Sequence, residues 1–257
     1  MSLQHFVSHI SEIEAYFGEG SYRAKRLVHF GGAGTDGICG YAHAAELYLA
    51  PGTKLLSHWH QDREAIFYCL EGEGVFLLDG LERRVGPGDG MFIPLGAVHG
   101  GFNAGAREFR FLDCALFTDT RSPLEVGEGC FARIGSAPTT TARGVTWKSL
   151  FPREAFGNQV IVWWGEVWLE PGQRMRPDRY EDDEQILYVL EGRGQLWLGP
   201  GEVELRPGSI VHILPDVVHA LANAGESPMR LVGSRSGIGR VLMPDYYRRL
   251  VLNREAS

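Results

Sequence analysis

The sequence predicts an all-β protein built from two copies of one structural unit. Short apolar runs separated by Gly, Pro and Asp recur along the chain, and a spacing of about 8–12 residues between such runs is typical of a β-sandwich or barrel. Positions 120 residues apart also match without a gap, so that Gly72 corresponds to Gly192 and His99 to His219. Such a repeat sets the architecture before any single motif is considered.

Composition narrows the class of protein. The 257 residues are 44% hydrophobic and 22% charged, which is ordinary for a soluble globular protein. A formal net charge of −7 argues against nucleic acid or an anionic membrane as the main partner. No apolar run is long enough to cross a bilayer, and the N-terminus lacks the features of a signal peptide. The four cysteines show no metal-type spacing, so we expect reduced thiols and a cytoplasmic protein.

The repeat divides the chain into five predicted segments: an N-terminal arm (1–40), an N-terminal barrel (41–120), a connecting segment (121–160), a C-terminal barrel (161–235) and a C-terminal helix with its tail (236–257). Strands are expected in the first copy near 44–50, 55–60, 65–70, 73–78, 82–85, 90–93, 98–103 and 108–117. In the second copy they are expected near 162–169, 174–179, 185–190, 193–198, 202–205, 210–213, 218–223 and 228–234.

Local signals place the remaining elements. The arm lies outside the repeat, and Ser11 is expected to cap a short helical turn that ends near Tyr16. Glycine is needed at Gly72 and Gly192, where the chain reverses tightly between two strands. After Pro244, helix-forming residues predict a short surface helix.

Three histidines of the first copy form a candidate metal site. Side chains alternate between the faces of a strand, so His58 and His60 point the same way. His99 follows about forty residues later at the start of another predicted strand. Imidazole binds Fe, Zn, Ni and Cu and, together with a carboxylate, Mn.

These residues resemble the cupin superfamily, and the repeat resembles its two-barrel members, the bicupins. The first cupin motif, G(x)5HxH(x)3–4E(x)6G, is matched at Gly52, His58, His60 and Gly72. The second, G(x)5PxG(x)2H(x)3N, is matched at Gly88, Pro94, Gly96, His99 and Asn103. The resemblance implies two double-stranded β-helix barrels, with one divalent metal ion (Fe, Mn, Ni or Zn) in the first.

The glutamate of the first motif is displaced. Counting back from Gly72 places it at position 65, which is alanine here, and Glu64 stands one residue too early. Strict alternation turns Glu64 away from the histidines, although a β-bulge would re-aim it. Glu184 occupies the matching place in the second copy, which favours a shared structural carboxylate. Glu64 is therefore a candidate fourth ligand, and the alternative is a site of three histidines alone.

The second copy carries a degenerate site. The matching positions hold Asp178, Tyr180 and Gln185, and only His219 is kept. This is a weak metal set, so we expect either a structural barrel or a metal-free pocket for a small ligand. The lone His212, in an apolar strand, is expected to belong to the core.

The chemistry of the first barrel follows from its expected lining. We expect an apolar substrate pocket with few acid or base groups, lined by Trp59, Phe67, Cys69, Phe76, Met91 and Phe102. Such a pocket suits a metal-dependent oxygenase that acts on a small chelating molecule, as in dioxygenases of the bicupin type. The alternatives are a non-oxygenase enzyme, such as a ureidoglycine-aminohydrolase-like hydrolase or a decarboxylase or isomerase, and a non-enzymatic ligand-binding protein. The partner is expected to be a small molecule, and the chain a monomer or homodimer.

Overall fold

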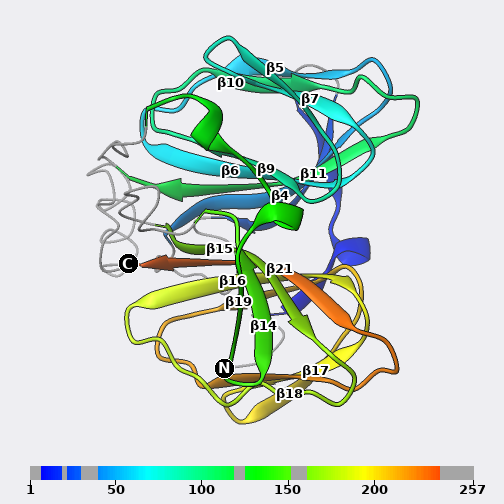
Figure 1. Cartoon of the computed structure of the whole chain (residues 1–257), viewed down its shortest axis with the longest axis vertical. Coiled ribbons are helices and arrows are strands. Elements are labelled where there is room, and N and C mark those ends of the chain that lie inside the picture. The colour runs from blue at the N-terminus through cyan, green and yellow to red at the C-terminus, as the bar shows by residue number, and fades with distance from the viewer. Residues whose placement is uncertain (1–6, 19–21, 30–39, 119–124, 152–160, 238–257) are drawn as a thin grey trace, which may run out of the picture.

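The computed structural model describes residues 7–18, 22–29, 40–118, 125–151 and 161–237. Within these ranges the chain forms two β-barrels, stacked so that their larger sheets face each other (Figure 1). This confirms the predicted all-β fold with two tandem barrels. No helix in the described ranges is long and apolar enough to cross a membrane. The helix predicted after Pro244 lies outside the described residues.

Two antiparallel sheets make up the first barrel. The larger has the order β12-β9-β6-β11-β4-β3-β2, with the bounds β2 (Ala15–Phe17), β3 (Arg23–His29), β4 (Tyr41–Leu49), β6 (Arg63–Glu71), β9 (Asp89–Ile93), β11 (Phe109–Phe117) and β12 (Phe131–Arg133). The smaller has the order β5-β10-β7-β8, with the bounds β5 (Lys54–His58), β7 (Gly74–Leu78), β8 (Leu81–Val85) and β10 (His99–Phe102). Mutually contacting phenyl rings fill the space between them: Phe67, Phe76, Phe109 and Phe111.

The second barrel repeats this plan with a smaller second sheet. Its larger sheet has the order β1-β19-β16-β21-β15-β14-β13, with the bounds β1 (Val7–His9), β13 (Thr139–Ala142), β14 (Val145–Ser149), β15 (Ile161–Leu169), β16 (Asp183–Glu191), β19 (Ser209–Ile213) and β21 (Met229–Gly237). The smaller contains β18 (Gly201–Leu205), β17 (Gly194–Leu198) and β20 (His219–Asn223). In the described ranges, three 3₁₀ helices lie outside the sheets: η2 (Ile10–Glu12), η3 (Glu128–Cys130) and η4 (Ile134–Ser136).

All but one of the predicted strands coincide with observed ones. The exception is 174–179, where only two isolated bridges form, from Arg174 to Ala222 and from Asp178 to His219. Pro177 has no N–H, so a regular ladder cannot run through this segment. The predicted helical turn is present as η2, but its cap and its end were predicted wrongly, because the side chain of His9 caps it and the chain continues as β2 before Tyr16.

The tight turns after β6 and β16 require glycine, as expected. Gly72 has φ +77° and Gly192 has φ +80°, a region that side-chain-bearing residues rarely adopt. A Cβ atom on Gly72 would also lie 2.3 Å from the carbonyl oxygen of Glu108. These turns fix the register of the hairpins that lead back across each barrel.

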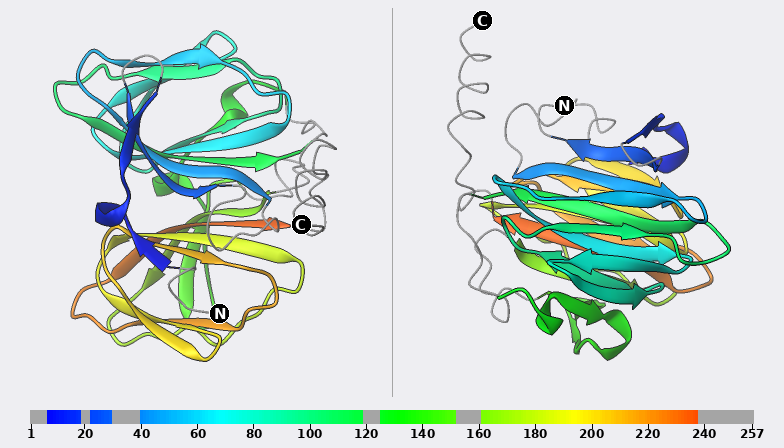
Figure 2. Two further views of the ribbon diagram at one scale, coloured as in Figure 1. Left: turned by 180° about the vertical axis from the view of Figure 1, so that it is seen from behind. Right: turned by 90° about the horizontal axis from the view of Figure 1, so that it is seen from above.

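The N-terminal arm and the connecting segment repeat each other, contrary to the prediction that the arm lies outside the repeat. Val7 of β1 pairs with Val211 of β19 in the second barrel, and Phe131 of β12 pairs with Met91 of β9 in the first. After its 3₁₀ helix each segment crosses to the other barrel, where β3 pairs with β4 and β14 with β15. The barrels thus exchange arms, and Figure 2 (left) shows the blue N-terminal arm spanning both.

Two buried glutamates join the facing sheets reciprocally. Glu46 of β4 accepts a hydrogen bond of 2.8 Å from the hydroxyl of Tyr188, which belongs to the second barrel. Glu166 of β15 accepts one from the hydroxyl of Tyr68, which belongs to the first. Burial, followed by the adjacent carboxylate, raises the pKa of both tyrosines, so each remains a hydrogen-bond donor at neutral pH.

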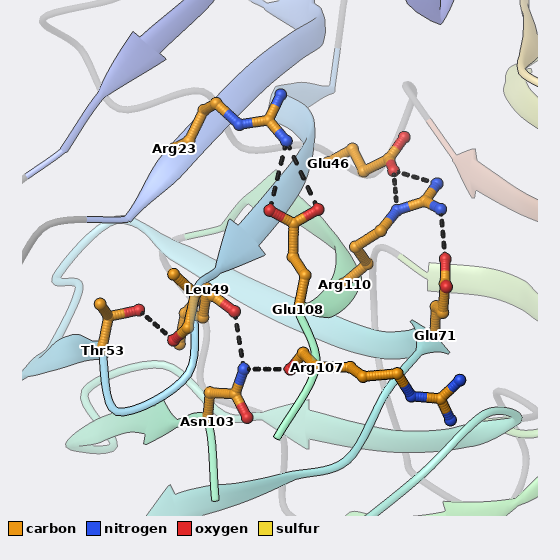
Figure 3. Close-up of polar contacts among 10 residues, drawn as sticks. Arg23, Glu46, Leu49, Thr53, Glu71, Asn103, Arg107, Glu108 and Arg110 are labelled. Atoms are coloured by element: carbon orange, nitrogen blue, oxygen red, sulfur yellow. Dashed lines mark hydrogen bonds and ion pairs between the residues drawn. The ribbon is translucent and has the colours of Figure 1, made fainter. Parts of the chain in front are cut away.

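Each of these glutamates is neutralised within its own barrel. Arg110 of β11 lies 2.6 Å from Glu46 and also bonds Glu71 at the edge of the sheet (Figure 3). Arg230 of β21 pairs with Glu166 at 3.1 Å in the same way. A buried carboxylate is tolerated when it is paired and hydrogen-bonded, and here one partner of each carboxylate comes from the opposite barrel.

Candidate metal site

Three histidines converge at one place in the first barrel. β5 ends at His58, His60 follows two residues later, and His99 begins β10 directly opposite His58 in the ladder. One ligand atom from each ring lies within 4.8 Å of the others. The predicted histidines therefore come together, although His60 and His99 are 39 positions apart in the sequence.

Backbone carbonyls orient two of the rings. Nδ1 of His58 bonds the carbonyl oxygen of Leu56 at 2.8 Å, and Nδ1 of His99 bonds that of Ala97 at 3.0 Å. A carbonyl oxygen only accepts, so Nδ1 is the donor in each bond, and in a neutral ring the free lone pair is then on Nε2. Such outer contacts are what fixes the tautomer of metal-bound histidine.

The donor set fits a metal ion. Nε2 of His99 is buried and has no hydrogen-bond partner among the described residues, and an orphaned buried polar atom of this kind calls for an explanation. Burial, together with repulsion from the neighbouring histidines, lowers the pKa of His60 and of His99 to about 4. Both rings are therefore neutral at pH 7, the form that binds metals.

Glu64 does not belong to this cluster. It lies on β6 next to Ala65, and strand alternation places the two side chains on opposite faces. Its carboxylate is buried, and Oε1 accepts a bond of 3.4 Å from the backbone N–H of Leu95. The matching Glu184 accepts bonds from Gly40 and from His212 in the core.

The six predicted pocket residues divide into two groups. Four are buried inside the barrel, and of these the Phe67 ring lies 5.7 Å from that of His99, while Cys69, Phe76 and Met91 are also fully enclosed. The other two lie elsewhere. Trp59 is 57% exposed. Phe102 pairs with the exposed Lys54, on the face of β10 opposite to His99. The apolar wall therefore lies on the β6 side of the histidines.

An acid–base pair that sequence reasoning missed stands in the same barrel. Nε2 of His43 on β4 lies 2.9 Å from Oδ2 of Asp113 on β11. Burial alone would raise the pKa of Asp113, but His43, followed by His99 and His60, holds it below its usual range. The barrel is thus not as poor in acid or base groups as predicted.

Comparison of the two copies contained the signal for this pair. His43 corresponds to Trp163 and Asp113 to Gly233. A Cβ on Gly233 would lie 2.7 Å from the ring of Trp163, so the indole fills the space that the carboxylate takes in the first barrel. Inward positions that are polar in one copy only are as informative as the histidines themselves.

The four positions of the degenerate site also come together. Asp178, Tyr180, Gln185 and His219 line one cavity of about 230 Å³ in the second barrel. No cluster of three metal-ligating side chains is found in the described part of this barrel. The predicted core residue His212 is buried and bonds Glu184 at 2.7 Å.

The asparagine of the second motif has a structural role in both copies. Nδ2 of Asn103 donates to the carbonyl oxygens of Leu49 and Arg107, at 2.8 and 2.7 Å (Figure 3). Asn223 makes the corresponding bonds to Leu169 and Ser227. It ties β4 or β15 to the loop that follows β10 or β20, and so braces the strand that begins with the histidine.

Known proteins match both halves of the chain. A family model described as "Cupin domain" matches residues 45–114 and 165–233. Quercetin 2,3-dioxygenase of Bacillus subtilis is 38% identical over 48 residues, which are 19% of this chain and 14% of that protein. The oxalate-binding protein of Thermotoga maritima is 35% identical over 68 residues, 26% of this chain and 56% of that protein. The match thus spans less than two thirds of either relative.

Solved structures share the fold at low identity. AerE from Microcystis aeruginosa superposes with a TM-score of 0.69 at 15% identity, over 90% of this chain and 99% of that one. At this identity the similarity concerns the arrangement of the two barrels, not the reaction.

Proposed function

Because this chain belongs to the cupin family through both of its barrels, we propose that it is a metal-dependent enzyme whose chemistry takes place in the first barrel. His58, His60 and His99 would hold one divalent ion, and the substrate is a small organic molecule. The observation that carries the proposal is the buried Nε2 of His99, which lacks a partner among the described residues and belongs to a cluster of three imidazoles whose ligand atoms lie within 4.8 Å of one another.

The surrounding residues supply the rest of the site. A divalent ion bound to imidazoles contributes Lewis-acid or redox chemistry, according to the metal. The ring of Phe67 against His99 excludes water from one side and offers an apolar surface to the substrate. The His43–Asp113 pair can hold or accept a proton near that surface.

The finer proposal is a dioxygenase-type oxidoreductase that acts on a small chelating, partly aromatic substrate. Neutral nitrogen ligands beside a wall of phenyl rings suit a redox-active metal and an apolar substrate. The short similarity to quercetin 2,3-dioxygenase supports the same direction.

The His43–Asp113 pair favours a second candidate, a reaction that proceeds by proton transfer. General acid–base catalysis requires a titratable pair within reach of the substrate, and this barrel contains one. An isomerase, a decarboxylase or a hydrolase of the ureidoglycine-aminohydrolase type would use it.

Metal analysis tests the site. Tag-free protein should carry close to one equivalent of divalent metal, and the double variant His58→Ala/His60→Ala should carry almost none. His99→Gln should lose metal as well, whereas the matched change in the second barrel, His219→Gln, should not. Equal near-zero metal in the wild type and the double variant would overturn the proposal.

Oxygen dependence then distinguishes the two reactions. A flavonol and other small chelating acids should be supplied to the metal-loaded enzyme in an oxygen electrode. Oxygen uptake that His99→Gln abolishes supports the dioxygenase. Turnover under nitrogen that His43→Gln abolishes supports proton transfer and excludes the oxygenase.

A further inference from the structure

The second barrel contains a cavity in the place that the histidine cluster takes in the first. Asp178, Tyr180 and His219, which line it, correspond to the three metal-ligand candidates. Its volume is about 230 Å³. For scale, an apolar cavity of about 150 Å³ holds a benzene molecule. The second-barrel cavity therefore has room for one ring and a small substituent.

Arg235 brings a guanidinium group into this cavity. It stands on β21 where the first barrel has Ala115. The carbon of the guanidinium lies 4.4 Å from the centre of the Tyr180 ring, and Nε lies 3.2 Å from Oδ2 of Asp183. Nevertheless, the buried Nε forms no well-directed hydrogen bond with the described residues. The ring of Tyr180 and the carboxylate of Asp183 thus hold the guanidinium in place, while its Nε–H lacks a hydrogen-bond acceptor among the described residues.

Arg143 brings a second guanidinium from a strained turn. It connects β13 to β14 with φ +55°, which is uncommon for any residue but glycine. Gly144 follows with φ +84°, so close to the neighbouring chain that a Cβ would lie 2.1 Å from the carbonyl oxygen of Arg174. Nη2 of Arg143 lies 3.1 Å from Oδ1 of Asp178. The hairpin is therefore pressed against the barrel, and its tip delivers a charge to the cavity.

The remaining lining has a neutral polar part and an apolar part. Gln185 stands where the first barrel has Ala65. Burial lowers the pKa of His219, and its Nδ1 bonds the carbonyl oxygen of Val217, so the ring is a neutral acceptor at Nε2. The indoles of Trp147 and Trp163 are among the apolar lining residues.

We propose that the second-barrel cavity binds a small organic carboxylate with a ring-sized apolar body and that it does so without a metal. Two guanidinium groups and one carboxylate belong to the lining of the cavity. The second carboxylate, Asp183, contacts Arg235 from outside the lining, so the surface that a ligand meets carries the excess of positive charge. Arginine matches the geometry of a carboxylate through two parallel N–H donors. The indoles offer the surface on which the apolar body packs.

Benzoate is the probe that tests this proposal. Titration calorimetry on the full chain should show benzoate binding with one site per chain, and the fluorescence of the tryptophans should change with the same midpoint. Benzamide has the same shape without the charge, and acetate has the charge without the ring, so each should bind at least tenfold more weakly.

Variants locate the site. Arg235→Ala, which installs the residue of the first barrel, should weaken benzoate binding at least tenfold. Arg143→Asn, which tolerates positive φ, should do the same even if the first variant folds poorly. Arg193→Ala removes an exposed arginine at the far end of β16 and should leave binding unchanged.

The double variant His58→Ala/His60→Ala distinguishes binding in the second-barrel cavity from binding at the metal site. Benzoate binding should survive in it unchanged. Loss of binding there would place the ligand on the metal and overturn the proposal, as would the absence of benzoate binding at millimolar concentration or equal affinity in wild type and Arg235→Ala. The proposal thus stands or falls independently of the reaction in the first barrel.

Discussion

The position of Glu64 shows how one residue changes the expected ligand set. The cupin motif places a glutamate where this chain has Ala65, and the displaced carboxylate lies on the other face of β6. It bonds the backbone of Leu95, while the corresponding Glu184 pairs with His212. Both copies thus use the carboxylate to bind neighbouring segments, which favours a site of three histidines.

Glu64→Gln should therefore leave metal binding almost intact. The amide oxygen still accepts the bond from Leu95, and no ligand is lost. Competition with a chelator should give a metal affinity within a few-fold of the wild type, whereas His99→Gln should lose far more. Loss of a hundredfold or more in Glu64→Gln would make this carboxylate the fourth ligand, since changes outside the ligand set typically cost about 10–100-fold.

The low pKa values of His60 and His99 predict how the metal-free protein responds to pH. Both values fall from the ordinary 6.5 to about 4. Between these limits the unfolded chain binds more protons than the native chain, so stability is full above pH 6.5 and declines as the pH falls toward 4.

Urea unfolding of metal-free protein at pH 7 and pH 5 measures this dependence. The wild type should lose more stability between the two than the variant His60→Asn/His99→Asn, which cannot take up these protons. Equal losses in the two proteins would show that the histidines titrate normally.

At the scale of elements, a pair of facing strands decides what each barrel contains. β4 and β11 carry His43 and Asp113 toward the first interior, and β15 and β21 carry Trp163 and Gly233 toward the second. The indole needs the glycine, because any Cβ there would meet its ring at 2.7 Å. The first barrel therefore has an acid–base pair at these positions, whereas the second has a tryptophan and a glycine that form part of a cavity wall.

Gly233→Ala should consequently destabilise the protein by about 1–3 kcal/mol, the usual cost of overpacking. Trp163→Phe removes the ring atoms that clash, so the double variant should recover part of the loss. Urea unfolding of the wild type, the two single variants and the double variant gives the coupling free energy between the two positions. Gly135→Ala is the control, because its Cβ would meet nothing nearer than 3.8 Å. Additive effects of Gly233→Ala and Trp163→Phe would refute the contact.

The sequence predicts the strands that alternate regularly and misses the elements that depend on distant partners. The histidine triad could be predicted because motif spacing and strand alternation are local properties. The irregular segment 174–179 could have been anticipated from Pro177 alone. The exchange of arms could not, because β1 and β12 are short, differ in sequence, and are offset by 124 residues rather than 120.

At the scale of the whole molecule, the two barrels are not separate bodies. Each buried glutamate at their junction depends on a tyrosine from the other side. Each larger sheet also has an edge strand from the other half of the chain, which is β12 in the first barrel and β1 in the second. Barrel stability is therefore shared, although the proposed chemistry differs between the barrels.

Tyr188→Phe should destabilise the whole protein by about 1–3 kcal/mol, because the buried side chain of Glu46 loses a hydrogen-bond donor. Tyr68→Phe should do the same through Glu166. Urea unfolding followed by tryptophan fluorescence and by circular dichroism should give one coincident transition in each case. The control Tyr16→Phe changes an exposed ring. A variant in which one barrel melts first would contradict the shared junction.

The exchange of arms also sets an order of events during protein synthesis. β12 emerges from the ribosome shortly after its partner β9, so the first barrel can gain that edge strand early. β1 is made before its partner β19, which follows about 200 residues later, a delay of roughly 10–40 s at typical rates of translation. β1 thus remains without its partner strand until the second barrel is nearly complete.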